Sequence, residues 1–128
     1  MSTALQEKTV LLVGAGSLGG PAALALASAG LGRMVIVDAT AVETTDLAGQ
    51  PLFAESDLGE RKAAAAARRL ARLFPGLRFE GLDRVFDAGS APGLVGAADL
   101  VVDASDDFAT MFAASDAAGD EVLATYPD

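Results

Sequence analysis

Three glycines near the N-terminus, Gly14, Gly16 and Gly19, follow an apolar run that begins at Val10. Their Gly-x-Gly-x-x-Gly spacing is typical of a strand that turns sharply into a helix, where backbone N–H groups can approach phosphates. Gly14 would make the tight turn, Gly16 would let the backbone come close to the phosphates, and Gly19 would let the helix pack on the strand. The motif therefore predicts a nucleotide site, although a strand-to-helix turn without a ligand would use the same glycines.

A nucleotide site of this type also needs a carboxylate, and Asp38 has the expected position. The apolar run 35–37 ends at Asp38, and an acidic residue about 20 positions after the last glycine usually holds the ribose hydroxyls of a nucleotide. The alternative is that Asp38 only caps the loop after the strand. The glycines and the carboxylate together favour a nucleotide, and by themselves they allow NAD as well as ATP.

The composition excludes several classes of protein. The chain has 128 residues, of which 52% are hydrophobic, and this is enough for one domain with one core. Lys and Arg total 9 against 18 Asp and Glu, a net charge of −9, so we expect no nucleic-acid partner. Without Cys or His, the chain has no thiol nucleophile, no cysteine-bound zinc and no imidazole for acid–base chemistry.

The hydropathy pattern predicts a protein of the cytoplasm. No uninterrupted apolar stretch reaches the roughly 18 residues of a membrane helix, and the segment 1–8 is too short and too polar for a secretion signal. We therefore expect no membrane partner.

Short apolar runs alternate with helical patterns along the chain. Strands are expected at 9–13, 34–37, 77–82, 99–103 and 121–125, and helices at 21–29, 59–74, 91–96 and 109–118, with a loop at about 39–58. This alternation predicts an α/β fold: a Rossmann-like, doubly wound and mainly parallel sheet with helices on both faces, forming a single domain over residues 1–128. The glycine turn, Asp38 and residues 103–107 would then meet at the carboxyl ends of the strands.

Taken together, the motifs resemble the ThiF/MoeB/HesA family, the ATP-dependent activators of ubiquitin-like and sulfur-carrier proteins. The matching segments follow one another in order over nearly the whole chain: 11–19, 21–23, 30–33, 35–38, 46–50, 52–53, 57–59, residue 62 and 99–106. The resemblance implies that ATP and Mg²⁺ are bound and that AMP is joined to the C-terminal carboxylate of a carrier protein, with release of pyrophosphate.

The resemblance also implies roles for individual residues. Lys62 matches the family lysine that contacts the ATP phosphates and stabilises charge in adenylation. Its place near a helix start disfavours a cation unless an anion is near, and a solvated lysine is the alternative. Asp106 matches the aspartate associated with magnesium and the reacting phosphate; the alternative is an N-cap for the next helix. The residues expected to bind the nucleotide are Gly14, Gly16, Ser17, Leu18, Gly19, Asp38, Gln50 and Lys62, with Lys62 and Asp106 catalytic.

Two departures from the family pattern bear on activity. Where one family element normally has Asn and Arg, this chain has Asp46 and Gly49, so a phosphate-facing cation is missing and a negative charge is added. Losing one such cation typically costs about 3 kcal/mol of transition-state stabilisation. Family members also continue beyond the position of Asp128, so we expect either the nucleotide-binding half of a longer protein or a shortened relative.

Three functions follow from these observations. The first is the ATP-binding domain of an adenylylating enzyme, and the second is a non-catalytic partner of an active subunit. The third is a nicotinamide-dependent oxidoreductase, which would lack His and have Tyr126 as its only tyrosine. An apolar edge strand at 122–125 would invite pairing with another chain, so we also expect a homo-oligomer, most simply a dimer.

Overall fold

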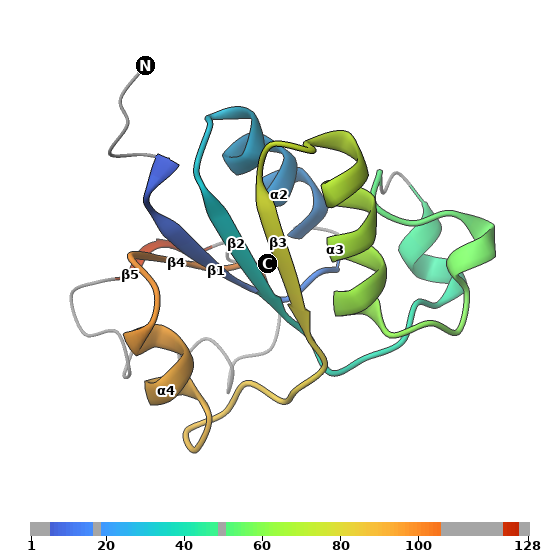
Figure 1. The fold of residues 1–128 in the computed structure, drawn as a ribbon. Helices are drawn as coiled ribbons and strands as arrows, with labels where there is room; N and C mark the ends of the chain where they lie inside the picture. The colour runs from blue at the N-terminus through green and yellow to red at the C-terminus, as the bar shows by residue number, and fades with distance from the viewer. Residues whose placement is uncertain (1–5, 17–18, 49–50, 106–121, 126–128) are drawn as a thin grey trace.

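Five parallel strands form one sheet in the computed structural model of the chain, which describes residues 6–16, 19–48, 51–105 and 122–125 (Figure 1). Their order across the sheet is β3-β2-β1-β4-β5. The strands are β1 (Thr9–Val13), β2 (Arg33–Val37), β3 (Arg78–Leu82), β4 (Leu100–Asp103) and β5 (Val122–Thr125). The chain thus moves outward from β1 to β3 and then returns to the other side of β1, which makes the carboxyl ends of β1 and β4 the switch point where ligands bind in such sheets.

Helices cover both faces of the sheet, as the alternation of elements predicts. They are α2 (Gly19–Ser28), α3 (Lys62–Leu73) and α4 (Ala91–Gly96); α2 and α3 lie on the face opposite α4 (Figure 1). Alternate side chains of β1 divide between the two cores, with Leu12 packed on the α2 and α3 side and Leu11 on the α4 side. The predicted doubly wound α/β fold is therefore confirmed.

The approach of α3 to the sheet depends on one glycine of β3. A Cβ added at Gly81 would lie 2.4 Å from the carbonyl oxygen of Ala63, so the backbones of strand and helix are nearly in contact. On the same face of α3, Ala63, Ala66 and Leu70 are fully buried. Their spacing is that of one helical stripe, which aligns the start of α3 with the end of the sheet.

The segment between β2 and α3 differs from the simple loop expected from the sequence. The helix expected from residue 59 begins only at Lys62, because residues 40–42 pair with residues 59–62. Val42 N–H donates to the carbonyl of Glu60 at 2.8 Å, and an antiparallel bridge joins Ala41 to Arg61. The intervening loop forms two 3₁₀ helices, η1 (Thr44–Leu47) and η2 (Glu55–Asp57).

Several expectations concern residues that the structure does not describe. These are the helix predicted at 109–118 and the predicted site residues Ser17, Leu18, Gln50 and Asp106. Within the described ranges, no helix has the length and apolar character needed to cross a membrane.

Candidate functional site

The turn after β1 requires glycine at two positions. Gly14 has a φ of +92°, a conformation that side chains disfavour, and its N–H donates to the carbonyl of Val37 at 2.9 Å. A Cβ added at Gly19 would lie 2.4 Å from the carbonyl oxygen of Gly14. The first glycine therefore shapes the turn, and the last lets α2 start directly against it.

Gly16 is different, because the fold itself does not explain it. Its φ is not in the left-handed region, and a Cβ added there would have no heavy atom within 4 Å among the residues that the structure describes. A side chain at this position would project into open space at the carboxyl end of β1. Gly16 is therefore the glycine of the three whose small size a bound ligand would use.

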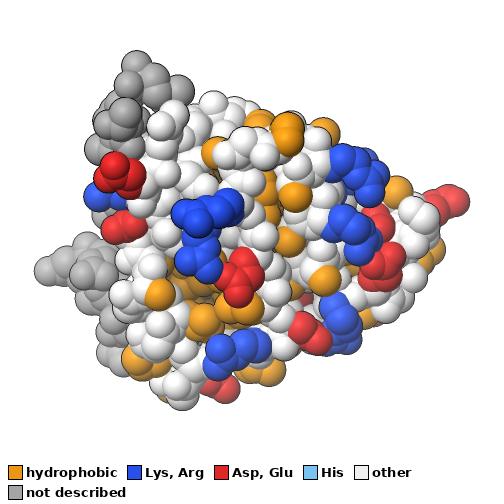
Figure 2. Space-filling model, in the orientation of Figure 1, with side chains coloured by type: hydrophobic (Ala, Val, Ile, Leu, Met, Phe, Trp, Pro, Cys, Tyr) orange, Lys and Arg blue, Asp and Glu red, His pale blue; other side chains and the backbone are white. Residues whose placement is uncertain are grey.

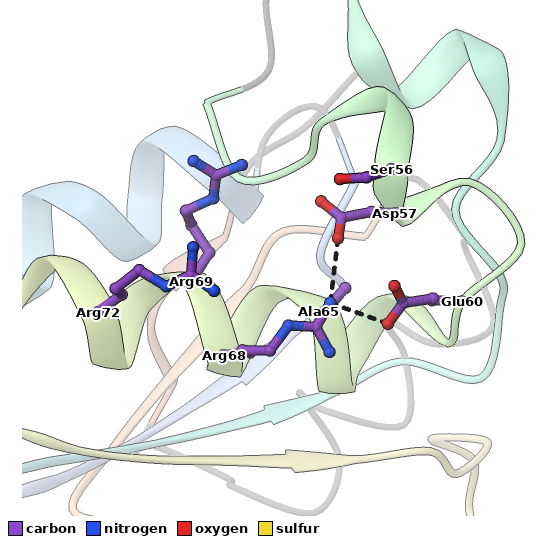
Figure 3. Close-up of a pocket in the computed structure, with 7 residues that line it drawn as sticks. All are labelled: Ser56, Asp57, Glu60, Ala65, Arg68, Arg69 and Arg72. Carbon is purple, nitrogen blue, oxygen red and sulfur yellow. Dashed lines mark hydrogen bonds and ion pairs between the residues drawn. The ribbon is translucent and has the colours of Figure 1, made fainter.

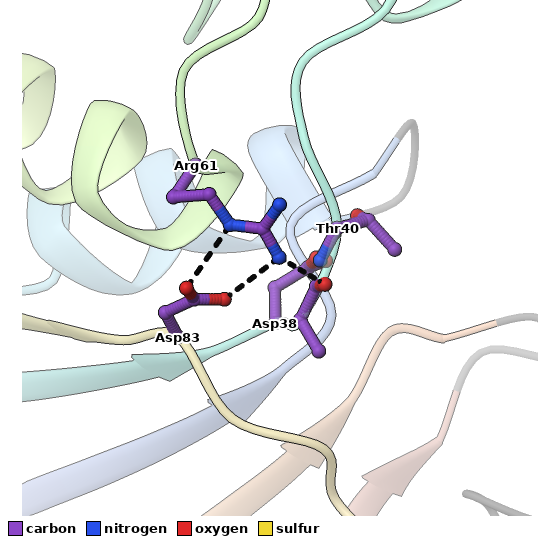
Figure 4. A network of polar contacts seen from close by, with 5 residues as sticks. Asp38, Thr40, Arg61 and Asp83 are labelled. Carbon is purple, nitrogen blue, oxygen red and sulfur yellow. Dashed lines mark hydrogen bonds and ion pairs between the residues drawn. The ribbon is translucent and has the colours of Figure 1, made fainter.

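Asp38, directly after β2, joins the glycine turn to the loop that follows. Its Oδ2 accepts a hydrogen bond from the N–H of Ala15 at 3.0 Å. Its Oδ1 accepts one from the N–H of Thr40 at 2.8 Å and one from the Thr40 hydroxyl, and Figure 4 shows Asp38 beside Thr40. An ionised carboxylate has about four acceptor positions. Asp38 therefore caps its loop, and its three bonds to described residues leave about one of its acceptor positions.

Arg61 supports the same region from the start of α3. Its guanidinium donates two hydrogen bonds of 3.0 Å to the carboxylate of Asp83 and a third to the carbonyl of Ala39 (Figure 4). The hydrogen bonding and charge of Asp83 raise the pKa of Arg61, and the charge of Asp38 adds a smaller increase. Sequence reasoning missed this residue, since 22 positions separate Arg61 from Asp83.

Lys62 is the first residue of α3, and its side chain is only 11% exposed. Its N–H donates to the carbonyl of Thr40 at 2.9 Å, and its ammonium lies 3.0 Å from Oδ1 of Asp46. The second oxygen of Asp46 accepts from the N–H of Glu43 at 2.8 Å. The alternative of a solvated lysine is therefore wrong: Lys62 is held by a carboxylate of the neighbouring turn, which we call the Asp46 turn (residues 43–47).

A second turn places the carboxylate of Asp57 beside the same helix, α3. Oδ2 of Asp57 accepts from the N–H of Ala54 at 2.8 Å, and its Oδ1 lies 3.0 Å from the guanidinium of Arg68, which also contacts Glu60 at 2.8 Å. We call residues 54–57 the Asp57 turn. It borders an open polar hollow of about 260 Å³ along α3 (Figure 3). The hollow is lined by Ser56, Asp57, Glu60, Ala65, Arg68, Arg69 and Arg72, none of them a predicted site residue.

Basic and acidic side chains alternate over the α3 side of the molecule (Figure 2). Arg68 contributes to this pattern, and its pKa is raised by hydrogen bonding to Glu60, by the charge of Glu60 and, less strongly, by Asp57. Arg68, Asp57 and Glu60 thus form one group of ion pairs on this surface.

The end of β4 closes the other side of the glycine turn. Asp103 is fully buried, and its Oδ1 accepts hydrogen bonds from the N–H of Ser105 at 3.0 Å and from the Ser105 hydroxyl at 2.7 Å. The N–H of Ala104 donates to the carbonyl of Val13 at 2.9 Å, and a Cβ added at Gly14 would lie 3.1 Å from Ser105 N. Residues 103–105 therefore lie directly against the turn.

The predicted site residues within the described ranges are connected. Asp38 bonds to the turn through Ala15 and to Thr40, and Thr40 bonds to Lys62. One hydrogen-bonded frame thus runs from the glycine turn to the start of α3. Asp106, the predicted metal ligand, lies outside the described residues, which include the segment up to residue 105. Among the described residues, no cluster of three or more metal-binding side chains occurs.

A glycine turn at the switch point of a parallel sheet, followed by a carboxylate at the end of the next strand, defines the Rossmann-like class of α/β folds. The ThiF family model matches residues 2–123, so the chain belongs to the ThiF family. The resemblance derived from the sequence is confirmed.

Curated relatives share this part of the chain. A sulfur carrier protein adenylyltransferase of Thermus thermophilus is 40% identical over 114 residues, which is 89% of this chain and 42% of that protein. The sulfur carrier protein ThiS adenylyltransferase of Escherichia coli is 36% identical over 106 residues, or 83% of this chain and 42% of that protein. The chain therefore spans about two fifths of the length of these relatives.

Solved structures share the fold. The E. coli tRNA N6-threonylcarbamoyladenosine dehydratase in complex with ATP matches with a TM-score of 0.87 at 23% identity, covering 96% of this chain and 52% of that one. At this identity, the likeness shows the arrangement of strands and helices alone.

Proposed function

We propose that this chain is the ATP-binding part of an enzyme that adenylylates the C-terminus of a ubiquitin-like or sulfur-carrier protein. The observation that carries the proposal is the hydrogen-bonded frame joining the glycine turn, Asp38 and Lys62 at the carboxyl ends of the strands. Open space at Gly16 supports it, because none of the residues that the structure describes requires a glycine there. The curated relatives in the same family are adenylyltransferases of sulfur-carrier proteins.

The reaction would proceed by attack of the carrier carboxylate on the α-phosphorus of ATP, which forms an acyl-adenylate and releases pyrophosphate. In this proposal the turn at Gly14, Gly16 and Gly19 approaches the phosphates with backbone N–H groups. Asp38 accepts a ribose hydroxyl, and Lys62 neutralises phosphate charge that develops during the transfer.

The remaining predicted residues complete the proposed site. Asp106 would hold Mg²⁺ through its carboxylate oxygens, Ser17 and Leu18 would belong to the phosphate turn, and Gln50 would order the loop beside it. A nicotinamide-dependent oxidoreductase and a non-catalytic structural partner are not favoured, since these relatives are named as adenylyltransferases. A homodimer through the outer strand β5 and a cytoplasmic location stay predictions, and light scattering at micromolar concentration tests the first.

Calorimetric titration with ATP and Mg²⁺, beside NAD under the same conditions, tests the proposal. We expect ATP to bind and NAD to give no heat. Gly16→Ala should leave thermal unfolding unchanged, because its Cβ enters open space, and should weaken ATP binding. Gly93→Ala in α4 is the matched control, since its Cβ also meets nothing within 4 Å but lies on the other side of the sheet from α3. A chain that binds NAD and not ATP contradicts the proposal.

A further inference from the structure

Lys62, to which the proposed function assigns the phosphates of ATP, already has an anionic partner within the fold. Its ammonium lies 3.0 Å from Oδ1 of Asp46, and the two side chains are only 11% and 12% exposed. A lysine at the start of a helix is disfavoured by the positive end of the helix dipole unless an anion is near. In the structure this anion is the carboxylate of Asp46.

The backbone directs this carboxylate toward Lys62. Asp46 ends the first turn of η1, where its N–H donates to the carbonyl of Glu43 at 2.9 Å and its Oδ2 accepts from the N–H of Glu43 at 2.8 Å. One oxygen is therefore held by the turn, and the other points to the ammonium. The main chain of Lys62 is held in turn by its bond to Thr40. Both ends of the ion pair are positioned before any ligand arrives.

A phosphate at Lys62 would meet this carboxylate. The ammonium has three donors, so a second acceptor is stereochemically allowed. Two anions around one cation in a place that is about one tenth exposed nevertheless repel each other, because water screens them poorly there. A ligand must therefore bring enough charge to displace Asp46 or to outweigh it.

We propose that Asp46 is an internal competitor that neutralises Lys62 and weakens nucleotide binding in proportion to the phosphate charge placed beside that lysine. The inference rests on the proposed function and concerns the regulation of the same site. It makes Asp46 a positioning residue: it acts through Lys62 and sets how strongly the site discriminates among ligands of different charge.

Asp46→Asn tests the proposal, because the amide keeps an oxygen for the N–H of Glu43 and removes the charge. Calorimetric titrations with ATP plus Mg²⁺ and with adenosine should be run on the wild type and the variant. We expect ATP to bind about tenfold more tightly to Asp46→Asn, the scale of one hydrogen bond to a charged group. Adenosine, which brings no phosphate, should change by less than about twofold.

Asp57→Asn is the matched control. Asp57 has the same place in its 3₁₀ turn, the same pair of contacts and a similar exposure of 13%, but its cation is Arg68. We expect its affinity for ATP to equal that of the wild type. Asp46→Ser, which keeps a side-chain acceptor for the turn, replaces Asp46→Asn if the latter does not unfold cooperatively.

The outcomes separate the inference from the function on which it rests. If wild type and Asp46→Asn bind ATP equally, or if the variant binds more weakly, the competitor role is wrong while ATP binding stands. A gain for adenosine equal to that for ATP also overturns it, because the effect would then not depend on phosphate. ATP binding by Asp46→Asn and not by the wild type would support the competitor role. If neither protein binds ATP, the proposed function is rejected together with the inference.

Discussion

The Asp46 turn and the Asp57 turn are built alike and used differently. In each, the aspartate accepts from the backbone N–H three residues earlier and offers its other oxygen to a cation of α3, at 3.0 Å in both. The cations differ: Lys62 is 11% exposed at the first position of the helix, whereas Arg68 is 46% exposed in its middle and is shared with Glu60. The same kind of capped turn therefore forms a shielded ion pair in the predicted site and a more solvated ion pair outside it.

Exchange of each cation for methionine should show the largest difference between the turns. Lys62→Met should weaken ATP binding by about tenfold or more, because a charge-assisted hydrogen bond to phosphate is lost and Asp46 stays as an unpaired anion. Arg68→Met should leave ATP binding unchanged within about twofold. Calorimetric titration of both variants measures this, and equal losses would mean that α3 acts through its total charge.

The same two variants should also differ in the free energy of unfolding. Lys62→Met leaves a carboxylate that is 12% exposed without its cation, which we expect to cost about 2 kcal/mol. Arg68→Met also leaves a shielded carboxylate, that of Asp57, but Arg68 is 46% exposed and water can take its place, so we expect a cost of less than about 1 kcal/mol. Urea denaturation at neutral pH gives both values. A larger loss for Arg68→Met would contradict the assignment of the shielded pair to Lys62.

Salt should separate the two pairs further. Between about 0.1 M and about 1 M salt the screening length falls from about 10 Å to about 3 Å, and this weakens exposed pairs first. The stability difference between wild type and Arg68→Met should therefore shrink in high salt, while that between wild type and Lys62→Met should largely persist. Urea denaturation at both salt concentrations tests this, and a parallel decrease for the two variants would show that both pairs are solvated.

A third acidic turn, without a cation in hydrogen-bond contact among the described residues, shows the capping effect with only a smaller contribution from the charge of Arg84. Oδ1 of Asp87 accepts from the N–H groups of Gly89 at 3.0 Å and Ser90 at 2.9 Å, and these bonds, that of Ser90 first, lower its pKa from the ordinary value of 3.8. A lowered pKa contributes stability above the unfolded value, which is lost as the pH falls through the folded value. The difference between wild type and Asp87→Asn in urea denaturation should therefore be smaller at a pH well below 3.8 than at neutral pH, and a constant difference would contradict this cause.

The parts of the fold that the sequence predicts are those with a local signal. The apolar runs, the glycine spacing and the carboxylate of Asp38 each depend on neighbours within a few positions, and the sheet and the glycine turn follow from them. The ion pair between Asp46 and Lys62 has no such signal, since 16 positions separate the two residues and their contact depends on the path of the loop. Their identities were visible in the sequence, but their neutralisation of each other was not.

The two 3₁₀ turns of the segment between β2 and α3 also have a local signal in the sequence, beyond those used to predict the fold. Asp46 and Asp57 each stand three positions after the residue whose N–H they accept, a spacing typical of a turn capped by its own side chain. The antiparallel contact of residues 40–42 with residues 59–62 could not be foreseen, because it depends on which side of the sheet edge the chain follows.

The antiparallel contact of residues 40–42 with residues 59–62 joins the two ends of the segment between β2 and α3. The bonds between Val42 and residues 59 and 60, with the bridge from Ala41 to Arg61, close a loop over residues 43–58 at its base. A loop closed in this way can open or exchange its amide hydrogens as a unit, at a free energy below that of unfolding the sheet. Opening would move Asp46 and leave Lys62 in place on α3. The opening rate of this loop would therefore set how quickly the ammonium of Lys62 loses its carboxylate partner. Insertions within the loop would change that rate without altering the register of a single strand.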